Sequence, residues 1–79
     1  MKKNLYQKAH EDISAIIAET KARKRWEDKD IGMVLDIKAS SVSDHRLKGT
    51  FPNMSFFKVL FLADASGYDI KFVKREAYR

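Results

Sequence analysis

The segment formed by residues 55–66 constrains this chain most, because apolar side chains surround almost the whole of it. Between Phe56 and Ala65 only Lys58 and Asp64 carry a charge. We expect a helix here, with Ser55 or Asn53 as its cap and Gly67 as its stop. A helix that is apolar nearly all round is normally buried on more than one side, so this one needs two partners.

The chain offers little material for that second partner. Its 79 residues are enough for one small domain, and they include no cysteine that could form a disulfide or bind a metal as thiolate. Small domains without such aids often gain burial by forming oligomers. We therefore expect a homodimer.

Residues 68–74 give an independent reason to expect a dimer. Their sequence, Tyr-Asp-Ile-Lys-Phe-Val-Lys, alternates between apolar and polar side chains and so predicts a β-strand. No other segment predicts a strand, and a lone strand needs a partner edge. The same strand of a second copy can supply it in a two-fold pairing. The expected dimer interface consists of Phe57, Phe61, Tyr68, Ile70 and Phe72.

Three further helices are predicted from the spacing of apolar residues and from helix-capping residues. They span residues 5–24, 28–35 and 40–48. The first carries one apolar stripe at steps of three and four. Its members are Leu5, Ala9, Ile13, Ile16, Ile17 and Thr20. We therefore expect one mainly α domain over residues 1–79, with four helices and a C-terminal strand used for dimerisation.

The net charge of +5 is distributed unevenly. Residues 1–25 contain seven basic and three acidic side chains, whereas residues 26–50 contain four basic and five acidic ones. The basic side chains are densest in residues 21–25. Such a cluster indicates binding to a polyanion such as nucleic acid, or else a solvated helix end whose cations favour the helix dipole. Charge alone does not choose between them.

Residues 28–48 have the organisation of a helix-turn-helix unit: a helix, a tight turn and a polar helix. Gly32 is small enough to allow a close crossing of the two helices. Asp36 occupies the turn and tolerates the left-handed backbone conformation better than most residues. Gly49 and Pro52 then end the second of these helices. The expected apolar anchors are Ile31, Leu35, Ile37 and Val42.

This spacing resembles the Cro/lambda-repressor-like (XRE-type) helix-turn-helix family of small phage-type DNA-binding proteins. The likeness rests on residues 30–37, Asp-Ile-Gly-Met-Val-Leu-Asp-Ile, followed by Ser-Val-Ser at 41–43. It covers about residues 26–52. The chain departs from the family pattern in carrying Asp36 for the usual turn glycine, Gly32 for the usual alanine and His45 for a large apolar residue.

The resemblance implies that the helix at 40–48 lies in the major groove of double-stranded DNA. The positions that match the base-contacting sites of the family are Lys38, Ala39, Ser40, Ser43, Asp44 and Arg46, with Leu47 as the alternative to Arg46. The phosphate contacts would come from Arg23, Lys24, Arg25, Lys29, Ser41, Lys48 and Thr50. Asp44 has a second interpretation, as a solvent-facing acid paired with Lys48.

Other residue patterns have plainer interpretations. Trp26 and the phenylalanines at 56, 57, 61 and 72 could stack on bases, but their spacing favours packing. Ser43, Asp44 and His45 are adjacent on one helix and point in different directions, so they cannot form a catalytic triad. Neither histidine has a second ligand at metal spacing. We therefore expect no enzyme activity, no cofactor, no metal and no small-molecule ligand.

The function expected from these features is sequence-specific regulation of transcription, with a homodimer repressing from a two-fold operator. The alternative is an antitoxin-type or phage interaction module, in which the apolar helix and C-terminal strand bind a toxin or host protein. A nonspecific nucleic-acid binder fits less well, because the middle third of the chain is nearly neutral. The charged N-terminus and the lack of an apolar run of about 18 residues predict a cytoplasmic protein without a membrane segment.

Overall fold

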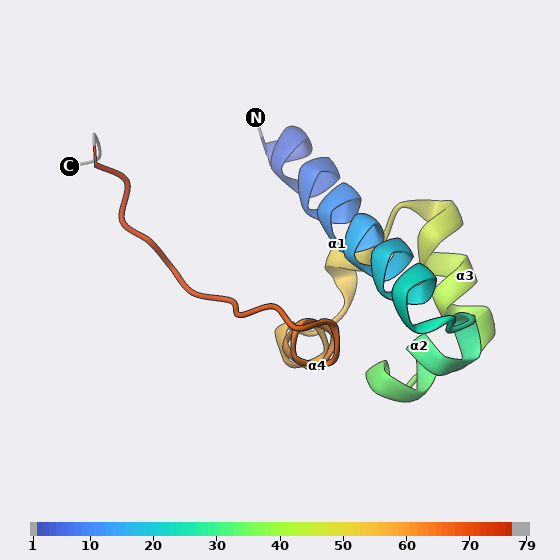
Figure 1. Cartoon of the computed structure of the whole chain (residues 1–79). Coiled ribbons are helices and arrows are strands. Elements are labelled where there is room, and N and C mark those ends of the chain that lie inside the picture. Colours follow the sequence, from blue (N-terminus) through green and yellow to red (C-terminus); the bar gives the residue numbers. More distant parts are fainter. Residues whose placement is uncertain (1, 77–79) are drawn as a thin grey trace.

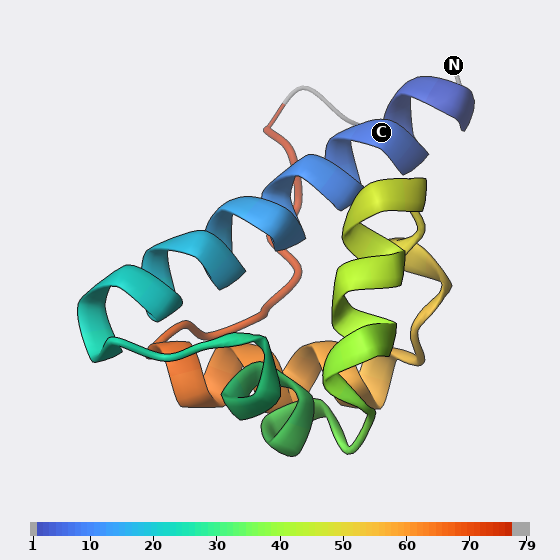
Figure 2. The same cartoon turned by 90° about the vertical axis from the view of Figure 1, so that its right-hand side faces the viewer.

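The computed structural model describes residues 2–76, which contain four α-helices and one short 3-10 helix (Figure 1). The elements are α1 (Lys2–Lys24), α2 (Asp28–Leu35), α3 (Ala39–Lys48), η1 (Phe51–Asn53) and α4 (Phe56–Ser66). The predicted mainly α organisation with four helices is confirmed. Figure 2 shows α1 along one side of the body, α2 and α4 along the opposite side, and α3 upright between them.

Each α-helix ends at a residue with left-handed backbone conformation. These residues are Arg25, Asp36, Gly49 and Gly67, with φ angles of 57°, 58°, 71° and 82°. The conformation turns the chain sharply and lets the next amide groups bond to the last carbonyls of the helix. The expected turn at Asp36 and the expected stops at Gly49 and Gly67 are therefore confirmed.

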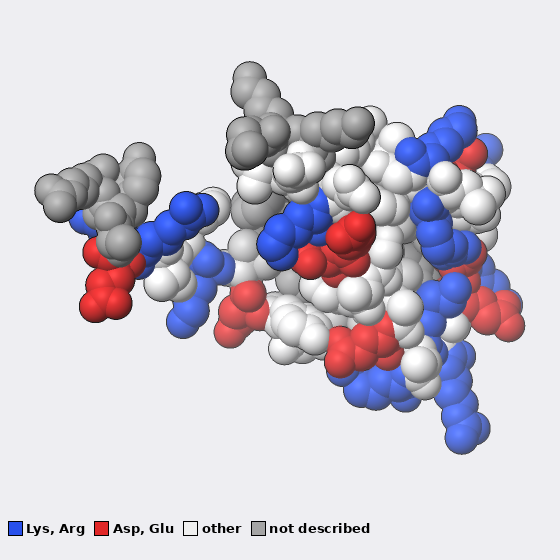
Figure 3. All heavy atoms as spheres, turned by 90° about the horizontal axis from the view of Figure 1, so that it is seen from above, with Lys and Arg blue, Asp and Glu red and all other residues white. Residues whose placement is uncertain are grey.

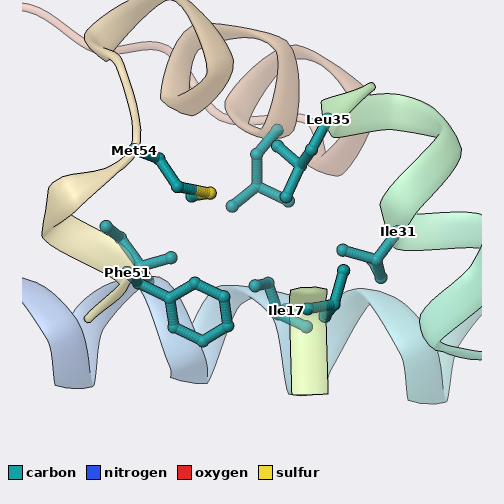
Figure 4. Packing of buried hydrophobic residues seen from close by; sticks show 8 residues of the cluster. Ile17, Ile31, Leu35, Phe51 and Met54 are labelled. Atoms are coloured by element: carbon teal, nitrogen blue, oxygen red, sulfur yellow. The ribbon is translucent and has the colours of Figure 1, made fainter. Parts of the chain in front are cut away.

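The hydrophobic core draws on every helix and on η1. Ile17 of α1, Ile31 and Leu35 of α2, Phe51 of η1 and Met54 converge on one volume (Figure 4). Val42 of α3 and Leu62 of α4 complete this buried cluster together with Ile13. Burying one side chain of this size contributes about 1.5–3 kcal/mol, so a core this small depends on nearly all of its members.

Polar contacts attach α4 to α1 and to α2. The fully buried Thr20 Oγ1 donates a 2.7 Å hydrogen bond to Ser66 Oγ. Lys58 Nζ donates a 2.7 Å bond to the carbonyl oxygen of Leu35, the last residue of α2. The ends of α1, α2 and α4 are thus fixed relative to one another.

The prediction of a C-terminal strand is wrong for the single chain. Residues 69–75 have no regular secondary structure, and no backbone hydrogen bond joins residues 69–74 to another part of the described chain. Figure 1 shows this segment leaving α4 and extending away from the helices. An extended segment cannot satisfy its own N–H and C=O groups, so without a neighbouring edge the alternating pattern does not produce a strand.

The predicted apolar stripe of α1 is correct only in its central and C-terminal part. Ile13, Ile17 and Thr20 are buried, whereas Leu5 is exposed. Figure 2 shows the first turns of α1 projecting beyond the other helices, in agreement with the exposure of Leu5. Among residues 2–76, no helix combines the length and the apolar character needed to cross a bilayer.

Gly32 lies where α2 meets the chain leading into α3. A Cβ atom at this position would lie 2.5 Å from the carbonyl oxygen of Ile37 and 3.3 Å from the carbonyl carbon of Lys38. Both neighbours are backbone atoms, which cannot move without displacing the turn. The expected role of Gly32 in allowing a close crossing is therefore confirmed.

We predict that Gly32→Ala destabilises the protein by about 1–3 kcal/mol, because the new methyl group overlaps the turn. Helix propensity alone predicts the opposite sign, a gain of about 1 kcal/mol. Urea unfolding followed by Trp26 fluorescence measures the difference. Met33→Ala, at an exposed neighbouring position of α2, is the matched control and should change stability little. A Gly32→Ala variant as stable as the wild type would contradict the close crossing.

Candidate nucleic-acid interface

The unit formed by α2, the turn and α3 is held together at both ends of α2. At its start, the backbone N–H of Glu27 donates a 2.8 Å hydrogen bond to the Asp30 carboxylate. At its end, the N–H of Ile37 donates a 2.9 Å bond to the carbonyl oxygen of Gly32. Ile37 packs against the core, and Val42 anchors α3 with no exposed surface. α3 is therefore fixed on the body.

The side of α3 opposite Val42 is exposed. Since successive residues of a helix are about 100° apart, Ser40, Asp44 and Leu47 lie about 140–160° from Val42, with Ser43 at the edge of this group. The first three are exposed and Ser43 is half-buried. We call these four residues the outward face of α3. Figure 2 shows α3 at the front of the molecule with no other element covering it.

Arg46 does not belong to the outward face. Its two terminal nitrogens donate hydrogen bonds of 3.1 and 2.6 Å to the two carboxylate oxygens of Asp28, at the start of α2. Lys21 of α1 donates a 2.7 Å bond to the same carboxylate. This ion cluster joins three helices. The guanidinium proposed for base contact from the sequence is thus engaged within the protein, and its geometry suits positioning of α3.

The electrostatics of the cluster agree with its geometry. The hydrogen bonds from Arg46 and then Lys21 lower the pKa of Asp28 from 3.8 to about 2, against a smaller opposing effect of burial. The bond to Asp28 in turn raises the pKa of Arg46. Bidentate pairing of a guanidinium with a carboxylate is the strongest geometry for such a pair. The cluster therefore stays ionised at every physiological pH.

The other predicted base-contacting residues lie close to the outward face. Lys38 precedes α3 at its N-cap and is exposed, whereas Ala39 is half-buried. The Asp44 carboxylate lies 3.1 Å from Lys48 Nζ, and both side chains are largely exposed. This contact matches the alternative interpretation of Asp44. Exposed pairs of this kind contribute little stability, so both groups are available to a partner.

The predicted phosphate contacts separate into two groups. Arg25 and Lys29 are exposed, and neither has an ion-pair partner within residues 2–76. Arg23 instead donates a 2.8 Å bond to the carbonyl oxygen of Ser66, and Lys24 lies over the Trp26 ring at 5.0 Å. The basic cluster at residues 21–25 therefore serves the protein itself in part. Trp26 packs against the core, as its spacing predicted.

Ser41 is half-buried, and Thr50 is engaged within the protein. The Thr50 hydroxyl lies 2.7 Å from His45 Nδ1. The rings of His45 and His10 lie on Phe51, with centroid distances of 5.8 and 5.3 Å. Both histidines therefore pack at the junction of α1, α3 and η1. Their sequence positions did not indicate this, because His10 and Phe51 are far apart in the chain.

Basic side chains gather on the side of the molecule that carries α3. Figure 3 shows Lys and Arg along the edge that corresponds to α3 in Figure 1, with acidic side chains between them. A surface of mixed charge attracts a polyanion less strongly than a purely basic one. Binding at this edge consequently needs contacts other than charge, and the outward face offers hydroxyl groups for them.

The predicted dimer-interface residues are exposed. Phe57 and Phe61 of α4 lie side by side, with ring centroids 4.7 Å apart, and Phe56 is exposed beside them. Tyr68 donates a 2.6 Å hydrogen bond to Glu19 of α1, which raises the pKa of the Tyr68 phenol. Ile70 and Phe72 lie on the extended C-terminal segment, where Phe72 is 94% exposed.

Sequence patterns did not identify the ion cluster of Lys21, Asp28 and Arg46. Asp28 is the first residue of α2. Arg46 follows it by 18 positions, so no local spacing connects the two. The sequence likewise left open whether Arg46 or Leu47 lies on the outward face.

We predict that Asp28→Asn lowers the free energy of unfolding at pH 7 by about 1–2 kcal/mol, because it removes a partly exposed ion cluster. The pKa of Asp28 is lower in the folded state, so this stabilisation is present above about pH 4. It is lost as the pH falls towards 2, and the two proteins should converge there. Asp12→Asn, in an exposed pair with Lys8, is the control. A difference that does not depend on pH in urea unfolding would contradict the cluster's role.

In comparisons with known proteins, no protein-family model, no curated protein and no solved structure matches the chain. A functional assignment therefore depends on the arrangement of the residues described above.

Proposed function

We propose that the protein is a sequence-specific double-stranded DNA-binding regulator of the Cro/repressor-like type that acts as a homodimer. The observation that carries the proposal is the outward face of α3. It is mostly polar and largely exposed, it belongs to a helix fixed on the body, and exposed cations flank it. A recognition helix needs these properties, because it must enter the major groove without rearranging.

The chemistry of the surface divides into two roles. The hydroxyls of Ser40 and Ser43 can donate to or accept from base edges, and Asp44 can accept from the amino group of cytosine. Arg25, Lys29 and Lys48 suit phosphate oxygens, which fix the protein on the duplex without specifying sequence. Lys38, at the start of α3, can serve either role.

A homodimer would place two recognition helices on neighbouring turns of the DNA. We propose that the exposed phenylalanines of α4 and the C-terminal segment form its interface. Figure 1 has α3 and the C-terminal segment on opposite sides of the body, so pairing through that segment leaves α3 uncovered. The half-sites of a two-fold operator would lie about 34 Å apart, or one helical turn. Occupying a promoter in this way would block transcription.

Selection of bound duplexes from a random DNA pool tests the proposal. We expect a two-fold consensus with half-sites about one turn apart. On that consensus, Ser43→Ala should change the preference at one base pair of each half-site. Lys29→Ala should instead weaken all sequences alike and reduce the salt dependence of binding. A pool without enrichment would contradict sequence-specific binding.

The proposed interface has its own test. At micromolar concentration, light scattering should give the mass of a dimer for the wild type. Phe57→Asp should give a monomer, because it places a charge in the apolar contact. Leu5→Asp, at an exposed apolar position of α1, is the matched control and should remain dimeric. A monomeric wild type would show that the α4 face has another role.

One observation favours a second function, binding of another protein. The exposed phenylalanines 56, 57 and 61 form an apolar surface on α4, and such surfaces commonly mark protein interfaces. A toxin or a host factor could cover it in place of a second copy. A monomer in light scattering together with an unenriched DNA pool would favour this function over DNA binding.

A further inference from the structure

Leu47 is the apolar member of the outward face of α3, and the residue is 82% exposed. A single exposed leucine is ordinary on a protein surface. Its position is what distinguishes it here. The other three members of the outward face as defined above, Ser40, Ser43 and Asp44, are polar, and so is Lys48 beside them.

The spacing of the four residues of the outward face matters. They stand at positions i, i+3, i+4 and i+7 of α3, which is the spacing of the base-contacting residues on the recognition helix of homeodomains. A helix lying in the major groove presents such a set to successive base pairs. Leu47 therefore lies in line with the serines, one turn further along the same face.

Arg46, which precedes Leu47 in the sequence, does not occupy the outward face. Arg46 is turned towards Asp28 by two hydrogen bonds of 3.1 and 2.6 Å and so is held away from the outward face. The same bonds fix the rotation of α3 about its axis near its C-terminal end. Leu47 is therefore kept on the outside without any contact of its own to the core.

The chemistry of Leu47 restricts its partner in DNA. Its side chain has no donor or acceptor, so it gains nothing from phosphate oxygens or from the polar edges of guanine, adenine and cytosine. The major groove presents one apolar group among the four standard bases, the C5 methyl group of thymine. Contact between this methyl group and Leu47 would remove apolar surface of both from water.

We propose, on the basis of the function proposed above, that Leu47 is a specificity-determining residue that contacts the C5 methyl group of a thymine in each half-site. The serines of the outward face make hydrogen bonds to neighbouring base pairs. Leu47 selects thymine over cytosine, guanine and adenine at its own position.

The test uses the 79-residue chain and the duplex obtained by selection. Each symmetry-related pair of thymines is replaced in turn by deoxyuridine, which pairs identically but lacks the methyl group. Fluorescence anisotropy then gives the affinity of wild type, Leu47→Ala and Met33→Ala for every duplex. Both substituted side chains are exposed, so both variants should fold normally, and circular dichroism verifies this.

At one thymine pair, the replacement should weaken the wild type about fourfold per methyl group, the equivalent of one buried carbon. Leu47→Ala should bind the thymine and deoxyuridine duplexes at that position equally. Met33→Ala should keep the full effect, since Met33 is equally exposed but lies on α2.

Two results would overturn the proposal, and they are distinguishable. If a consensus is enriched but Leu47→Ala loses affinity equally for all duplexes, or not at all, the thymine contact is wrong and DNA recognition stands. If no sequence is enriched, the proposed function fails and the role of Leu47 fails with it.

Discussion

The close contact between α2 and the turn into α3 determines where the outward face of α3 lies. At Gly32 the two segments approach until no Cβ atom fits between them. The left-handed backbone at Asp36 then reverses the chain within a few residues. The buried Val42 and the Asp28–Arg46 pair prevent α3 from rotating about its axis or shifting along it. Because a protein of this size has a small core, the position of α3 depends largely on these few contacts.

The positions of the charges follow from the same arrangement. Five basic side chains make contacts within the molecule or at its helix ends: Lys21, Arg23, Lys24, Arg46 and Lys58. Those left at the surface near α3 are few, and acidic side chains lie among them. A sequence-specific binder benefits from this balance, since a strongly basic surface binds every DNA sequence. In the function proposed above, the polar and apolar groups of the outward face would decide which sequence is preferred.

The local patterns of the sequence predicted the helices and their ends well. Apolar periodicity and turn residues such as Asp36, Gly49 and Gly67 act on the backbone next to them. The helices and helix ends that they predict therefore do not depend on contacts between distant residues. Contacts between distant residues were not predictable in this way. Phe51 belongs to the core through a 3-10 helix with no periodic pattern, and Arg46 finds Asp28 only because α2 and α3 cross.

The C-terminal segment shows that a clear local pattern does not by itself produce the predicted strand. Its alternation is clear in residues 68–74, yet a strand is stable only against a partner edge. The single chain provides none within its described residues. Apolar side chains on this segment and on α4 are exposed in the single chain, and for this reason we propose a dimer interface there.

The DNA-binding interpretation is tested most directly by mapping the contact surface residue by residue. Amide chemical shifts of labelled protein can be followed by NMR while the selected duplex is added. The interpretation predicts large changes along α3, at Ser40, Ser43 and Leu47, and at Lys29 of α2. The amides of α4 around Phe57 and Phe61 should not differ between the free and bound dimer. Changes confined to α4, or none at all, would contradict it.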